Sequence, residues 1–137
     1  MIKWKLIIQL SFFGFIMALA TVFSLSALME PFFWLIVFLF CAYMIARYAP
    51  GMYFLHGFLV GMVNCIWVTS AHILLFEFYM GNHPEMKSFA DAVMPRHPRL
   101  LMALTGPVFG AVSGVILGFL CVWAAKMLKE KAVKNAN

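Results

Sequence analysis

The sequence predicts an all-α integral membrane protein: a four-helix transmembrane bundle with a short extracytoplasmic amphipathic helix between spans three and four. Hydrophobic residues make up 65% of the chain and charged residues only 11%, against about 45–50% and about 25% in an average soluble domain. A soluble fold of 137 residues leaves much of its surface in water and does not bury so many apolar side chains. Because this length allows one domain, we expect residues 1–137 to form a single transmembrane domain.

Four apolar runs predict the four spans, because a transmembrane helix needs about 20 mainly apolar residues. We expect the first span at about 6–29, which is longer than the apolar core of a secretory signal, about 7–15 residues. Pro31 suits the first turn of the second helix, at 31–48. Ala49-Pro50-Gly51 then predicts a turn. The third span is expected at 52–80, so long that its helix must tilt or project beyond the hydrocarbon, and the fourth at 100–125.

The loop at residues 81–99 contains the pattern of a further helix. Pro84 suits a first helical turn, and Asn82 or His83 precedes it as a candidate cap. Apolar residues then recur at helical spacing on one face, and Pro95 ends the pattern; the apolar residues are Met86, Phe89, Ala90, Val93 and Met94. We therefore expect a short amphipathic helix on the outer membrane surface or over the end of the bundle.

The lysine and arginine residues predict the orientation. Seven of the ten lie on one side of the predicted spans: Lys3, Lys5, Arg47, Lys126, Lys129, Lys131 and Lys134. The other three are Lys87, Arg96 and Arg99. The positive-inside rule places both termini, including a tail at 126–137, on the cytoplasmic face of an inner (plasma) membrane. We expect the last ten residues of this tail to be frayed. Because these charges are dispersed and not gathered on one face, the expected partner is the lipid bilayer and not nucleic acid.

A glycine stripe is the most specific local pattern. Gly106, Gly110, Gly114 and Gly118 recur every four residues in the fourth span, and such a stripe lets two helix backbones approach closely in lipid. The stripe can pack inside one chain or form a homo-oligomeric seam, and both interpretations stay open. Pro107 lies within it and is expected to kink the helix.

Polar residues in the third span form a second candidate site: Asn64, Thr69, His72 and Glu77. A polar or ionisable side chain in hydrocarbon is costly and by default faces the bundle interior. His72 and Glu77 are five residues apart, so a straight helix places them on different faces. The pattern allows either a polar path through the bundle or a structural, hydrogen-bonded histidine at His72.

Methionine and histidine alternate around the outer loop and form a third candidate, a metal site. The residues are Met80, His83, Met86 and His97. Thioether and imidazole groups together suit copper, above all Cu(I), and zinc is a second possibility. Apolar packing also explains the methionines. No other cofactor is expected, since the three cysteines form neither a CxxC motif nor a cluster with histidine.

The sequence contains none of the common hydrolase, metalloprotease or nucleotide-binding motifs, so we expect no catalytic residues. The leading hypothesis is a non-enzymatic accessory, assembly or scaffold subunit that acts through helix packing, alone as a homo-oligomer or within a larger membrane complex. The first alternative is a small transporter or channel with a polar path around His72. The second is extracytoplasmic metal binding. An enzyme that acts on lipid through His83, Glu85 and His97 comes last.

Overall fold

The computed structural model describes residues 1–135, and helices connected by short turns and loops are the only regular secondary structure in this range. Its helices are α1 (Trp4–Phe23), α2 (Glu30–Tyr48), α3 (Tyr53–Leu74), α4 (Phe76–Asn82), α5 (Pro84–Val93) and α6 (Pro98–Lys134). Four of them, α1, α2, α3 and α6, are long and apolar enough to cross a membrane. Large apolar side chains, among them Phe12, Ile36 and Phe119, cover their outer surfaces. Such surfaces are those of an integral membrane protein.

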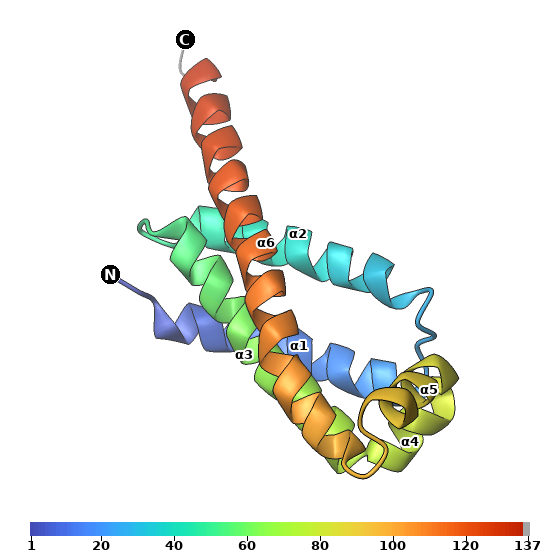
Figure 1. The fold of residues 1–137 in the computed structure, drawn as a ribbon. Helices are drawn as coiled ribbons and strands as arrows, with labels where there is room; N and C mark the ends of the chain where they lie inside the picture. The colour runs from blue at the N-terminus through green and yellow to red at the C-terminus, as the bar shows by residue number, and fades with distance from the viewer. Residues whose placement is uncertain (136–137) are drawn as a thin grey trace.

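The four long helices alternate in direction, and the two short ones lie together at one end (Figure 1). We call this end, formed by residues 75–97, the α4–α5 end. The opposite end, which contains the turn at residues 49–52 and the N-terminus, is called the turn end. The most extensive contact in the fold joins α3 to α6, whereas α2 packs mainly on α6 and only lightly on α1 and α3.

The predicted third span is wrong in one respect: residues 52–80 form two helices and not one. The helix is interrupted at Leu75, and α4 turns back to contact α1. Tyr79 and Met80 are thereby buried in one apolar cluster with Val22 of α1. Asn82, predicted as a candidate cap for the next helix, instead donates its side-chain N–H to the carbonyl of Val22. These contacts with α1 explain an interruption that no proline or glycine marks.

Two other boundaries also differ from the prediction. The first helix ends at Phe23 and not near residue 29. The last helix continues to Lys134, so the last ten residues, which were expected to be frayed, are helical up to that point, and residues 136–137 lie outside the described part. At 1.5 Å per residue α6 is roughly 55 Å long, well beyond the roughly 30 Å of a hydrocarbon core. The predicted helix in the loop is present as α5, and its N-cap residue is His83 and not Asn82.

At the turn end, hydrogen bonds made by His56 connect the N-terminus to α3. The backbone N–H of Lys3 donates to Nε2 of His56 at 3.0 Å. That bond leaves the ring proton on Nδ1, which donates to the carbonyl of Met52 at 3.0 Å. The Lys3 ammonium also donates to the carbonyl of Tyr48, at the end of α2. Gly51 has a φ of 150°, which glycine adopts readily and other residues do not.

Two apolar clusters form the core. One surrounds Ile45 and Leu117 in the half nearer the turn end, and the other surrounds Val22 and Met102 at the α4–α5 end. The cavity described next borders both clusters, because Phe38 of the first and Met102 of the second contribute to its lining.

Candidate functional site

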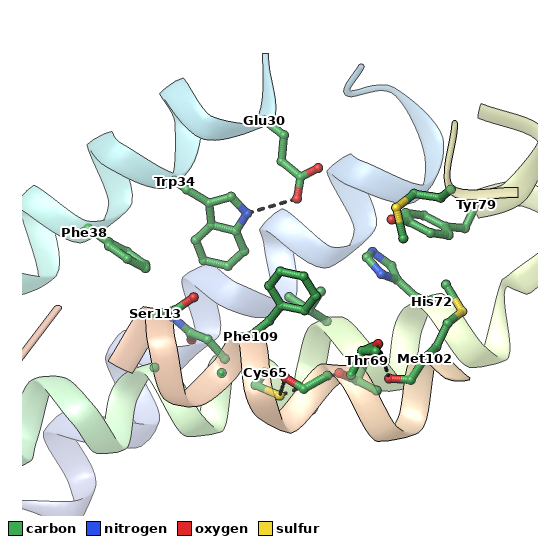
Figure 2. Close-up of a pocket in the computed structure, with 17 residues that line it drawn as sticks. Glu30, Trp34, Phe38, Cys65, Thr69, His72, Tyr79, Met102, Phe109 and Ser113 are labelled. Atoms are coloured by element: carbon green, nitrogen blue, oxygen red, sulfur yellow. Dashed lines mark hydrogen bonds between the residues drawn. The ribbon is translucent and has the colours of Figure 1, made fainter. Parts of the chain in front are cut away.

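A cavity of about 420 Å³ lies between α2, α3 and α6, with contributions from α4 and α5. This volume is within the range of about 300–1,000 Å³ that is typical of small-molecule sites. Its apolar lining residues are Trp34, Phe38, Val68, Met86, Met102 and Phe109, and its polar ones Glu30, Asn64, Cys65, Thr69, His72, Tyr79, Thr105 and Ser113. Figure 2 shows Glu30, Trp34 and Phe38 on one side of the cavity, and Cys65 and Thr69 on the other.

Close glycine contacts between α3 and α6 form one wall of the cavity. A Cβ on Gly61 would collide with the Cα of Gly114, and a Cβ on Gly57 would lie 2.8 Å from the Cα of Gly118. Toward the α4–α5 end, Gly110 packs against Cys65. The glycine stripe predicted on the fourth span therefore contacts α3 of the same chain. Gly57 and Gly61, which complete the seam, were not predicted as packing residues, although their own four-residue spacing carries the same signal.

Asn64 lines the cavity, and its side chain has no hydrogen-bond partner in the part of the chain that the structure describes. Both its side-chain oxygen and its side-chain nitrogen are buried and unpaired, and the residue is only 4% exposed. Its amide packs against the backbone of Gly14 on α1. Leaving such a group unpaired typically costs about 1–3 kcal/mol, and most buried polar groups in folded proteins have partners. The unpaired amide therefore points to a ligand.

His72, predicted as the central polar residue, lies at the α4–α5 end of the cavity. Thr21 donates its hydroxyl proton to the carbonyl of Ala18 at 2.9 Å. The contact of 3.0 Å between Thr21 Oγ1 and His72 Nε2 is then a bond in which His72 donates. This assignment leaves Nδ1 of His72 as a hydrogen-bond acceptor.

An aromatic stack continues from His72 across the interruption between α3 and α4. The rings of His72 and Tyr79 are 3.8 Å apart between centroids, and those of Tyr79 and His83 4.4 Å. Burial raises the pKa of Tyr79 to about 12, with further contributions from the carboxylates of Glu30 and Glu85. The phenol at the cavity wall is therefore neutral at any physiological pH.

Within residues 1–135, Glu30 is the only lining residue with an acidic or strongly basic side chain. One of its carboxylate oxygens accepts the indole N–H of Trp34 at 3.2 Å, and Figure 2 shows this bond at the cavity edge, with Tyr79 and His72 across from it. Glu30, Trp34 and Tyr79 were not among the site residues predicted from the sequence. Their convergence depends on the fold, and no local pattern marks it.

The structure separates Glu77 from the other predicted polar residues. Asn64, Thr69 and His72 line the cavity, whereas the Glu77 side chain is 84% exposed and lies 3.8 Å from Arg99. Arg99 also lies over the ring of Phe76, 5.0 Å from its centroid. His72 and Glu77 lie on different helices, α3 and α4, so the straight-helix geometry from which they were predicted not to pair does not apply.

The four residues of the predicted metal site have different surroundings. Met80 and His83 are buried, Met86 lines the cavity, and His97 is exposed before the start of α6. His83 donates from Nδ1 to the carbonyl of Tyr79 at 3.1 Å, and its Nε2 is buried without a partner. Over residues 1–135, no group of three or more His, Cys, Asp or Glu residues is placed to hold a metal ion. Copper or zinc binding by the methionine–histidine set stays a prediction.

Comparisons with known proteins identify no relative: no family model, curated protein or solved structure matches this chain.

Proposed function

We propose that this protein is a small membrane transporter that binds a small amphipathic molecule in the cavity between α2, α3 and α6. The observation that carries the proposal is Asn64, a residue of the cavity lining whose side-chain amide is buried between α3 and α1 with neither polar atom paired within residues 1–135. A ligand with a hydroxyl or amide group would satisfy that amide and recover the free energy of its desolvation. A scattering of polar groups within a largely apolar lining is the usual composition of a small-molecule site.

The distribution of polar groups supports an amphipathic ligand. Glu30, His72 and Tyr79 gather at the α4–α5 end, whereas Asn64 precedes His72 on α3 by eight residues, about two helical turns. Phe38, Val68 and Phe109 supply apolar surface to the same cavity. A molecule with a polar head, an apolar body and one hydrogen-bonding group matches this lining.

Interrupted backbone next to the cavity supports transport over static binding. The interruption at Leu75 falls between the lining residues His72 and Tyr79, and Pro107 follows the lining residue Gly106 within α6. Discontinuous helices beside a binding site are common in transporters, where they accompany the movement of one part of the bundle against another. We propose that Leu75 and Pro107 are the positions at which the bundle bends during transport.

The glycine stripe gives no support to the hypothesis of a scaffold subunit that packs on another chain. Gly110, Gly114 and Gly118 are buried against α3, so within a single chain they are already covered and do not offer a free seam to a second copy.

The proposed binding is tested by identifying what the purified protein retains. Wild-type protein, Asn64→Leu and Ser113→Phe would be reconstituted in lipid nanodiscs, and bound small molecules extracted and analysed by mass spectrometry. Ser113→Phe fills the cavity from α6, whereas the matched control Val112→Phe changes the neighbouring residue, which is 55% exposed. We expect a molecule that wild type and Val112→Phe retain and both cavity variants lose. Identical extracts from all four proteins would refute binding in the cavity.

Transport is then tested with the retained molecule itself. Vesicles that contain wild-type protein and are preloaded with the unlabelled molecule should accumulate its labelled form by exchange. Vesicles with Ser113→Phe should not. Retention of the molecule without exchange would support a binding protein and contradict the transporter proposal.

A further inference from the structure

We infer that the ligand carries a positive charge, an organic ammonium group held by Glu30 at the α4–α5 end of the cavity. This inference rests on the proposed function and specifies the chemical class of its ligand. Glu30 supplies a carboxylate to a lining that, among the residues that the structure describes, contains no lysine or arginine. A cationic group is the natural partner of such a carboxylate, whereas an anion would meet only repulsion from it.

The surroundings of the carboxylate favour a cation. Trp34 donates to one oxygen of Glu30, which fixes the carboxylate and leaves its second oxygen for a ligand. The aromatic rings of Trp34 and Tyr79 both line the cavity, on either side of Glu30 in Figure 2, and aromatic faces attract ammonium groups through their quadrupoles. Together they supply the two interactions by which proteins recognise organic ammonium ions.

The basic residues at this end of the molecule are Lys87, Arg96 and Arg99, and all three are exposed. Arg99 lies beside Glu77 and over Phe76, and its side chain is 58% exposed. Lys87 of α5 is exposed, and neither residue lines the cavity. Glu85 contributes a second negative charge close enough to act on Tyr79. The field at this end of the cavity is therefore negative.

Asn64 specifies the rest of the ligand. Its unpaired amide offers a donor and an acceptor beyond the carboxylate end, and these match an amide or hydroxyl in the ligand body. The structure thus assigns an ammonium head, an apolar or aromatic body and one internal hydrogen-bonding group.

Three benzamides of similar size test this assignment. Diethylaminoethyl benzamide is a cation at neutral pH, hexyl benzamide is uncharged, and benzoyl aminohexanoate is an anion. Binding to the protein in nanodiscs would be measured by equilibrium dialysis, with empty nanodiscs as the background. We expect the cation to bind saturably and about tenfold more tightly than the uncharged compound, the effect of one favourable charge interaction, and the anion to bind most weakly.

Glu30→Gln should remove the tenfold preference and leave the affinity for hexyl benzamide unchanged, which also shows that the variant is folded. Glu77→Gln is the matched control, because it removes an exposed carboxylate outside the cavity and should leave the preference intact. Equal binding of the three compounds to wild type, or a preference that survives Glu30→Gln, would overturn the charge assignment. So would a wild-type protein that binds none of them. The proposed function fails separately, when Ser113→Phe loses no retained molecule.

Discussion

The side-chain amide of Asn64 on α3 lies against the backbone of Gly14 on α1, at a place where any Cβ on residue 14 would collide with it. Glycine at position 14 thereby makes room for a buried polar side chain between α1 and the cavity. The lack of a side chain on α1 and the unpaired amide on α3 are two parts of one arrangement.

Gly14→Ala should therefore disturb the ligand site more than the fold. The added methyl group meets the end of a flexible side chain, so we expect a loss of about 1–3 kcal/mol in unfolding free energy together with weaker retention of the ligand. Thermal unfolding in nanodiscs and mass spectrometry of the retained molecule measure the two effects. Unchanged retention would show that the position of Asn64 does not matter for binding.

Gly61→Ala should cost more stability than Gly14→Ala, because its Cβ would meet the backbone of Gly114 and not a movable side chain. We expect a loss of about 3 kcal/mol or more, the upper range for overpacking. Gly81→Ala is the control: a Cβ there meets nothing within 4 Å, and in helix α4 alanine should stabilise by up to about 1 kcal/mol. Equal stability of the Gly61 and Gly81 variants would contradict the close contact of α3 with α6.

His56→Leu should loosen the turn end. The substitution removes the acceptor of the Lys3 N–H and the donor to the Met52 carbonyl. Leaving a buried group unpaired costs about 1–3 kcal/mol. Hydrogen exchange measured by mass spectrometry should show faster exchange at the start of α1 than in wild type. His97→Leu, at an exposed position, should leave exchange at the start of α1 unchanged. An equal effect of both substitutions would contradict the role of His56 in holding the N-terminus against α3.

The raised pKa of Tyr79 predicts that the protein loses stability at alkaline pH. Burial holds the pKa of its phenol at about 12, against an ordinary value of 10.0. Below pH 10 the phenol is neutral in the folded and unfolded states alike. Between pH 10 and 12 the unfolded chain releases this proton first, so the contribution to stability is lost as pH rises. The midpoint temperature of thermal unfolding should therefore fall more steeply over this interval in wild type than in Tyr79→Phe. Parallel curves of midpoint temperature against pH would contradict the burial of Tyr79.

The sequence predicts the helical class and the four long apolar helices because both depend on composition and on local hydrophobicity. It also predicts the glycine stripe and the polar residues Asn64 and His72. It does not predict the interruption at Leu75, which no proline or glycine marks. That interruption depends on contacts of Tyr79 and Asn82 with α1, and such long-range contacts leave no periodic signal.

The cavity is unpredictable from the sequence for the same reason. Glu30 precedes Asn64 by more than thirty residues, and only the packing of α2 on α6 brings both to one cavity. Gly57 and Gly61 are a different case. Their spacing matches that of the stripe on α6, so a search for small residues on every span would have indicated the seam.

The most direct test of ligand binding in the cavity is the stability of ligand-free Asn64→Leu. If the amide of Asn64 exists to bind a ligand, replacing it with an apolar side chain of similar size removes an unpaired buried group. The ligand-free variant should then be more stable than ligand-free wild type by about 1–3 kcal/mol, although the substitution abolishes ligand binding. Thermal unfolding of both proteins after exhaustive washing in nanodiscs measures this difference. A variant that is less stable than wild type would show that Asn64 supports the fold itself, and would contradict the account.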